Sequence, residues 1–143
     1  MAHYSELDSD NIVTQIVVIS DADENGTEAN GIAFCQSLFG DDTVWKKTSY
    51  NTHAGVHKTG GTPFRMNYAQ IGDTYNSEHD GFFKTSEPQP FDSWTMSTTT
   101  GIWTAPTPMP TDDPQDGYVW GWDETTLSWV EVEEPEFEEP ESE

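Results

Sequence analysis

Two tryptophan-rich segments that repeat at a shift of 26 residues constrain this chain more than any other feature of its sequence. Residues 94–103 (WTMSTTTGIW) overlay residues 120–129 (WGWDETTLSW), and each segment has a polar turn centred on Thr-Thr between its outer tryptophans. Aromatic residues that flank a short Thr, Gly or Asp turn are typical of antiparallel β-hairpins. The repeat therefore predicts two hairpins, and a protein built from such hairpins is usually a recognition or assembly module without catalytic machinery.

The tryptophans of these hairpins are the candidate contact residues. If each hairpin turns tightly, Trp120 faces Trp129 and Trp94 faces Trp103, with Trp122 on the same side of the ribbon. A longer loop would change these partners. Because a two-stranded ribbon is marginal alone, the aromatic rows are expected to cover a thin sheet. In the alternative, one row stays exposed and contacts a sugar ring or another protein.

Charge is the strongest feature of the composition, with 27 acidic and five basic residues and a formal net charge of −22. All five cations lie between residues 46 and 84, whereas residues 111–143 carry thirteen acids and no cation. Such a surface repels nucleic acid, so direct nucleic-acid binding through a basic patch is excluded as a main activity. Three explanations remain open: solubility in a salty environment, docking of an acidic tail on a basic partner, and mimicry of DNA.

The order of apolar, glycine-rich and acidic segments predicts an α+β fold. We expect one helix with a small N-terminal sheet in residues 1–50, a strand–helix–strand head, and a glycine-rich loop over residues 51–63. Serial antiparallel β-hairpins with aromatic residues follow over residues 64–130. Residues 131–143 form an acidic tail, which is expected to be flexible because it lacks the apolar content needed for ordering.

Individual elements follow from local patterns. Residues 12–19 are β-branched and predict a strand buried on both faces. Apolar residues at helical spacing predict a helix over residues 27–39, with Gly40 as its C-cap. Further strands are expected over 43–49, 64–68 and 72–75. Residues 75–83 form a weaker third aromatic hairpin, and alternating prolines make residues 106–114 a stiff connector.

One short segment of the sequence resembles part of a calcium-binding loop. Asp21, Asp23 and Asn25 match the first half of a calcium loop, but position twelve of that loop, where a bidentate Glu is required, is Ile32. A polar turn whose acids favour the positive end of the next helix is the preferred interpretation.

The single Cys35 predicts no internal disulfide and is expected to be buried and inert. The first residues do not resemble a signal peptide, and no apolar run is long enough for a membrane span.

The order of several motifs resembles a family of small, mostly uncharacterised proteins encoded by marine tailed phages, cyanophages and their relatives. The motifs are residues 30–39 (NGIAFCQSLF), 48–51 (TSYN), 65–75 (RMNYAQIGDTY), 88–94 (PQPFDSW), 105–112 (APTPMPTD) and 122–129 (WDETTLSW). The resemblance spans roughly residues 11–130 and transfers no catalytic or binding residue. It implies a phage-encoded virion component, such as a capsid decoration, neck or fibre-associated subunit. The loop at 54–63 and the acidic tail are longer than is usual in this family.

The leading hypothesis is a non-enzymatic virion structural protein, made in the host cytoplasm, that needs no cofactor and contacts other virion proteins. One alternative is a carbohydrate-binding module that uses exposed tryptophan faces on a host surface glycan. Another is an intracellular acidic inhibitor that competes with DNA. Association with a second copy of the chain is a further option, and no membrane contact is expected.

Overall fold

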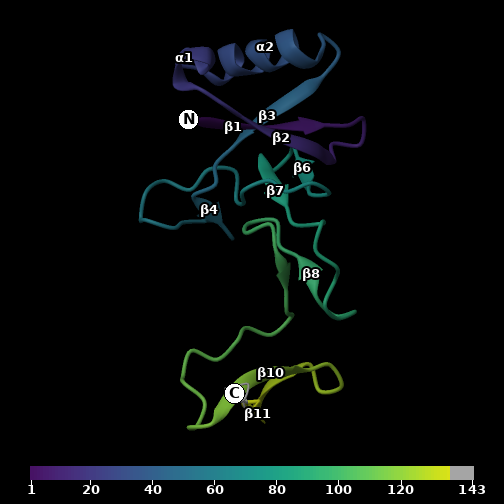
Figure 1. Cartoon of the computed structure of the whole chain (residues 1–143). Coiled ribbons are helices and arrows are strands. Elements are labelled where there is room, and N and C mark those ends of the chain that lie inside the picture. The colour runs from purple at the N-terminus through teal and green to yellow at the C-terminus, as the bar shows by residue number, and fades with distance from the viewer. Residues whose placement is uncertain (136–143) are drawn as a thin grey trace, which may run out of the picture.

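The computed structural model describes residues 1–135 and confirms the α+β class, with two helices and a series of small antiparallel sheets. The elements follow one another along a line from the helices to the last hairpin (Figure 1). The first sheet has the order β2-β1-β3 and comprises β1 (Ala2–Leu7), β2 (Val13–Ile19) and β3 (Val44–Thr48). All of its pairings are antiparallel, and the register shifts between Glu6 and Leu7 of β1.

The central strand β1 was not expected from the sequence. The strand predicted over residues 12–19 is confirmed as β2, but the prediction that it is buried on both faces is wrong. β2 lies at the edge of the sheet, and its Thr14 and Val18 are exposed. β1 takes the central place although it carries polar residues. Ser5 is buried there because its hydroxyl donates to the Lys46 carbonyl at 2.9 Å, which satisfies the buried polar group.

The helical layer lies over one face of this sheet and consists of α1 (Asp21–Glu24) and α2 (Glu28–Phe39). The predicted helix over residues 27–39 is confirmed, with Thr27 as its N-cap and Gly40 as its C-cap. The Thr27 hydroxyl accepts from the Asn30 N–H at 3.1 Å, which satisfies one of the free donors at the helix start. Local capping and apolar spacing are therefore sufficient to define this element.

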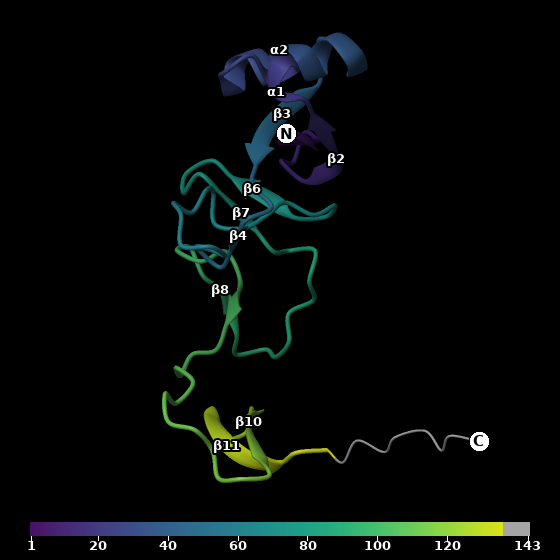
Figure 2. The same cartoon turned by 60° about the vertical axis from the view of Figure 1, so that its left-hand side comes forward.

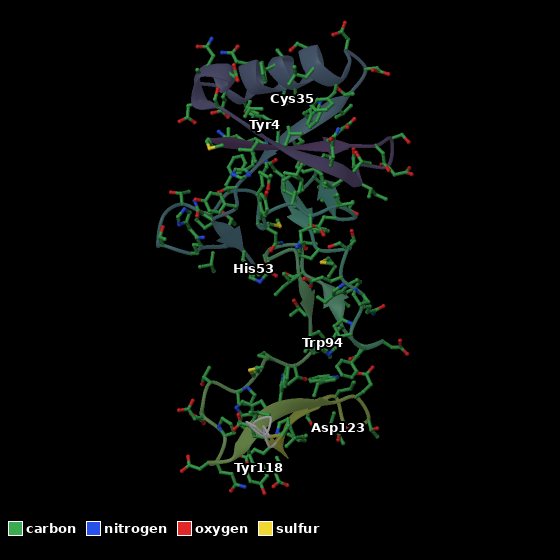
Figure 3. All side chains as sticks on the ribbon, viewed as in Figure 1. Tyr4, Cys35, His53, Trp94, Tyr118 and Asp123 are labelled. Atoms are coloured by element: carbon green, nitrogen blue, oxygen red, sulfur yellow. The ribbon has the colours of Figure 1, made fainter. Side chains whose placement is uncertain are left out.

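The first core lies between α2 and the sheet. It contains Ala2, Tyr4, Ile19, Cys35 and Trp45, and Figure 3 shows Tyr4 and Cys35 in this layer. Burial raises the pKa of the Cys35 thiol to about 11, so the thiol stays protonated at neutral pH.

The second core lies on the far side of the sheet, where β6 (Thr74–Asn76) pairs with β7 (Gly81–Phe83). It contains Leu7, Val13, Ala69, Tyr75 and Phe82. The expected third aromatic hairpin is thereby confirmed, with Tyr75 opposite Phe82. The start of β2 is tied to this hairpin because Val13 N–H donates to the Asp73 carbonyl at 2.8 Å.

The segment over residues 51–68 differs from its prediction. Within the expected glycine-rich loop, β4 (Thr52–His53) pairs with β5 (Val56–His57) in a minimal hairpin. The strand expected over 64–68 is absent, since Arg65 and Met66 have φ values of 51° and 69°. Such left-handed residues interrupt an extended strand.

The last two hairpins lie at the end of the molecule away from the helices (Figures 1 and 2). They are formed by β8 (Thr95–Met96) with β9 (Trp103–Thr104) and by β10 (Tyr118–Asp123) with β11 (Ser128–Glu133). β11 continues into the expected acidic tail as far as Glu133, so the boundary placed at residue 131 is wrong. The rest of the predicted tail, residues 136–143, lies outside the described residues.

Candidate functional site

The two tryptophan hairpins share one register, although that register differs from the predicted one. Met96 pairs with Trp103, and Trp122 pairs with Trp129 at the equivalent positions 26 residues later. The predicted oppositions are wrong, since Trp120 faces Glu131 and Trp129 faces Trp122. The reason is a wider turn, because residues 124–127 separate the last paired residues of the second hairpin. The internal repeat therefore extends to strand pairing.

Three tryptophans from both hairpins pack together. The ring centroid of Trp94 lies 5.9 Å from that of Trp122 and 6.0 Å from that of Trp129. Trp122 and Trp129 are 5.3 Å apart with nearly perpendicular rings. Edge-to-face pairs at such distances are favourable beyond the area that they bury. Trp94, which is labelled in Figure 3 between the two hairpins, therefore joins the last hairpin to the preceding one.

A single carboxylate strengthens the same joint. Glu124 accepts hydrogen bonds from the Ser93 N–H at 3.0 Å, the Ser93 hydroxyl at 2.6 Å and the Trp122 indole N–H at 2.8 Å. The hydrogen bonds from Ser93 and then Trp122 lower the pKa of Glu124 below its ordinary value. Glu124 thus remains ionised at neutral pH and links the two hairpins by polar contacts.

The indole N–H groups of Trp103, Trp120 and Trp129 donate to backbone carbonyls outside their own hairpins. Trp103 donates to Glu87 at 2.9 Å, Trp129 to Thr107 at 2.8 Å and Trp120 to Asp112 at 2.9 Å. The Thr107 hydroxyl in turn donates to the Leu127 carbonyl at 2.9 Å. The bonds to Thr107 and Asp112 fix the proline-rich connector against the second hairpin, whereas the bond to Glu87 ties Trp103 to the segment that precedes the first hairpin.

An open pocket of about 250 Å³ lies between the hairpins and the connector. Its lining is mainly apolar and comprises Trp94, Ile102, Trp103, Thr104, Ala105, Thr107, Pro108, Met109 and Trp129. We call this site the tryptophan pocket. Three of the five predicted contact residues, Trp94, Trp103 and Trp129, line it. Trp122 packs against two of them, and Trp120 lies outside the lining and donates to the Asp112 carbonyl of the connector.

The polar atoms of the pocket define what it can bind. The N–H groups of Trp103 and Trp129 are already engaged, and the Nε1 atom of Trp94 is buried without a partner among the described residues. The pocket therefore offers apolar and aromatic surface with few free donors or acceptors. Such a lining suits an apolar side chain, whereas sugar recognition requires convergent polar groups.

Sequence reasoning missed Glu124 and the pocket residues Ile102, Thr107 and Met109. Acidic residues are so abundant that no single carboxylate stands out in the sequence. The proline-rich segment indicated a stiff connector, but nothing local indicated which surface it would cover. All of the tryptophans in the two hairpins are half-buried. Their burial is therefore intermediate between the expected rows that cover a thin sheet and the alternative of one exposed row.

The three candidate calcium ligands do not form an open loop. Asp21 and Asp23 belong to the helical turn α1, and Asn25 caps its end with a φ of 51°. Asp21 pairs with the amino group of Met1 at 2.8 Å. Within residues 1–135, no three His, Cys, Asp or Glu side chains gather in a manner that could hold a metal ion. The geometry of α1 agrees with the alternative prediction of a polar turn with acids at a helix start.

Two further results concern the chain as a whole. No helix in residues 1–135 combines the length and apolar character needed to cross a membrane. Comparisons with protein-family models, curated proteins and solved structures find no match to this chain.

Proposed function

We propose that this protein is a non-enzymatic bacteriophage virion structural protein, a capsid decoration, neck or fibre-associated subunit, that acts through protein–protein contacts. The observation that carries this proposal is the tryptophan pocket. Its lining is mainly apolar, and the indole N–H groups of Trp103 and Trp129 in it are bound to backbone carbonyls. The last two hairpins, which supply most of this lining, lie at the end of the molecule away from the helices (Figure 1). Tryptophan-lined pockets of this kind are typical anchor points for a partner's side chain.

The order of sequence motifs supports the phage context of the proposal, as described above. The arrangement of the elements supports an assembly role, because the head and the hairpins follow one another along a line (Figure 2). In such a shape the head and the tryptophan pocket can contact different neighbours on a particle. The occupant of the pocket is then an apolar side chain of another virion protein.

The carbohydrate alternative at the same tryptophans is less favoured. A sugar ring that stacks on an indole also needs hydrogen-bond partners for its hydroxyl groups. The indole N–H groups of Trp103 and Trp129 donate to backbone carbonyls instead. Glycan-array binding by the wild type, Trp94→Ala and Trp122→Ala separates the two functions at these tryptophans. Binding that both substitutions abolish would favour the carbohydrate role, and a response that they leave unchanged would not.

Mass spectrometry of purified particles from a phage that encodes this chain tests the proposal. We expect the protein in particles at a fixed ratio to the major capsid protein. Met109 is an exposed residue of the pocket, so Met109→Asp should reduce incorporation without disturbing the packed tryptophans. Ile71→Asp is the matched control, because Ile71 is also exposed and is not part of the pocket. Absence of the wild-type protein from particles, or equal incorporation of both variants, would contradict the proposal.

A further inference from the structure

A second pocket, of about 230 Å³, lies beside β4 and is lined by a different kind of residue. Two tyrosines, a threonine, a histidine, a glutamine, a lysine and a glutamate surround it. None of the hairpin tryptophans contributes to it. His53, which is labelled in Figure 3 on the flank of the molecule, marks its position well away from Trp94. We call it the flank pocket.

The lysine of the flank pocket is Lys84, and it is only 4% exposed. Its ammonium group donates to the Gln70 side-chain oxygen at 2.6 Å and to the Asp73 carboxylate at 2.8 Å. An ammonium group has three N–H donors, and a buried donor without an acceptor is costly. Among the described residues only these two acceptors are recorded, so one donor is left for an oxygen atom of a ligand.

The charges around Lys84 disfavour an anionic ligand. Asp73 is fully buried and pairs with the ammonium group, which neutralises it. Asp73 also accepts from the Gln70 N–H at 2.8 Å and from the Ser86 hydroxyl at 2.5 Å. Glu87 adds a negative charge to the lining, and Lys58, whose ammonium group lies 4.8 Å from the centroid of the Tyr50 ring, adds a positive one beside it. The chain as a whole carries a net charge of −22. A neutral ligand with hydroxyl groups suits this combination better than a carboxylate or phosphate.

Aromatic rings form part of the pocket wall. Tyr50 is 54% exposed, and its ring lies 5.2 Å from that of His3. The His3 ring also packs edge-on against Tyr68 at 5.5 Å, and its Nδ1 atom shares a hydrogen bond with the Tyr68 hydroxyl at 3.2 Å. His3 thereby holds both tyrosines in place. Fixed aromatic rings beside polar groups can receive the apolar face of a sugar ring while its hydroxyls are hydrogen-bonded.

We propose that the flank pocket binds one neutral sugar residue. Lys84 and Gln70 bind its hydroxyl oxygens, and Tyr50 and Tyr68 contact its ring. This site does not depend on the proposed virion function. No residue lines both pockets, although the Trp103 indole N–H of the tryptophan pocket donates to the Glu87 carbonyl of the flank pocket. A protein that fails to enter particles could still bind a sugar here, and the reverse also holds.

Nuclear magnetic resonance titration of the ¹⁵N-labelled full chain tests the proposal. The probes are glucose, galactose, mannose, N-acetylglucosamine and rhamnose, with sodium acetate as the anionic probe. We expect at least one sugar to cause saturable shifts of amides in residues 50–53, 68–70 and 84–87. Tyr50→Ala and Gln70→Ala, both at exposed positions, should weaken that binding about tenfold or more. Met109→Ala, at an exposed position of the tryptophan pocket, should leave it unchanged.

Three results would overturn the proposal. The first is that none of the sugars shifts these amides at millimolar concentrations. The second is that the shifts map to residues 94–109, which would place the sugar at the tryptophan pocket. The third is that acetate shifts the flank-pocket amides and the sugars do not, which would show an anion site.

Discussion

Arg65 is the residue that connects the head with the hairpins below it. Its guanidinium group forms a two-pronged pair with Glu28 at 2.6 and 3.0 Å. It also donates to the Lys47 carbonyl and to the Asp80 carboxylate, each at 2.9 Å. The planar guanidinium group of arginine carries several N–H donors in a fixed arrangement, so it can bind several acceptors at one place better than the ammonium group of a lysine can. One cation thereby links α2, β3 and the β6–β7 turn.

The pairing of Glu28 makes stability depend on pH. Burial alone would raise the pKa of Glu28, but hydrogen bonds from Arg65 and from the Lys47 N–H outweigh it, so the pKa is lowered. A depressed folded-state pKa stabilises the protein above the ordinary value of 4.5, and this stabilisation is lost as the pH falls through the folded-state pKa. Glu28→Gln should therefore reduce the free energy of unfolding at neutral pH.

Urea unfolding of Glu28→Gln and wild type at a series of pH values checks this prediction. The difference between them should shrink steadily as the pH is lowered below 4.5. Glu78→Gln is the control, since Glu78 lies exposed on the β6–β7 turn. A difference that stays constant across the acid range would contradict the role given to the Glu28–Arg65 pair.

Gly31 sets the distance between α2 and the sheet. A Cβ atom at this position would lie 2.1 Å from the hydroxyl oxygen of the fully buried Tyr4. Alanine improves helix propensity by about 1 kcal/mol, but overpacking a core costs about 1–3 kcal/mol. At so short a distance the clash should prevail, and Gly31→Ala should lower the free energy of unfolding. Urea unfolding measures this free energy, and Ala33→Ser, at an exposed position of the same helix, is the control. If Gly31→Ala were as stable as the wild type or more stable, the close packing of Gly31 against Tyr4 would be contradicted.

At the scale of elements, Asn67 holds three segments together. Its buried amide nitrogen donates to the carbonyls of Phe82 and Thr100, each at 2.9 Å, and to that of Gly101 at 3.2 Å. Its amide oxygen accepts from the Ala54 N–H at 2.8 Å. The β4–β5, β6–β7 and β8–β9 hairpins therefore meet at one side chain, which compensates for their short strands.

Asn67→Asp should destabilise the protein more than Asn67→Ala at neutral pH. The aspartate keeps the shape of the side chain but turns a carboxylate oxygen toward three carbonyl oxygens. In Asn67→Ala, the loss of the amide group leaves buried carbonyl acceptors unpaired, which lowers the free energy of unfolding by about 1–3 kcal/mol. Thermal unfolding of both variants at neutral and acidic pH measures the difference, which should narrow in acid when the aspartate is protonated. The opposite ranking at neutral pH would show that Asn67 does not act as a donor.

The last hairpin depends on Glu124 and on the packed tryptophans. Glu124→Ala removes the three hydrogen bonds to Ser93 and Trp122. Amides in residues 118–133 should then lose protection from hydrogen exchange, while those of β1 keep theirs. Asp123→Ala is the neighbouring control, because within residues 1–135 the Asp123 carboxylate accepts a hydrogen bond only from the Thr125 N–H of the turn. Unchanged protection in residues 118–133 would show that Glu124 does not hold this hairpin.

The sequence predicts which segments form helices and hairpins better than it predicts which strands and residues pair with one another. The helix over Glu28–Phe39 was foreseen because its caps and apolar spacing are local signals. The tryptophan hairpins were foreseen as well, but their register depends on loop length, which Thr-Thr turns do not define. β1 was missed because its alternation is weak. Its central place results from pairing with two strands that lie further along the chain.

Only part of the candidate site could be predicted from the sequence. Trp94, Trp103 and Trp129 were identified from the repeat, and they line the tryptophan pocket. Met109 was not identified, because its part in the pocket depends on how the connector folds back over the hairpins. The flank pocket could not be foreseen either, since it combines residues from β4 with residues after β7 that share no motif.

At the scale of the whole molecule, charge dominates. A net charge of −22 on 143 residues destabilises the folded state by self-repulsion. Sodium chloride should therefore raise the melting temperature steadily from low salt to about 0.5 M, where the screening length is only a few ångströms. Differential scanning calorimetry measures this effect, and a melting temperature that is flat or falls over the same range would contradict it.

We propose that the tryptophan pocket receives an apolar side chain of another virion protein. Electron cryo-microscopy of a particle from a phage that encodes the chain is the decisive experiment. We expect density for a partner's apolar side chain between Trp94, Trp103 and Trp129. A reconstruction that lacks this protein, or that shows the pocket open to solvent, would contradict the account.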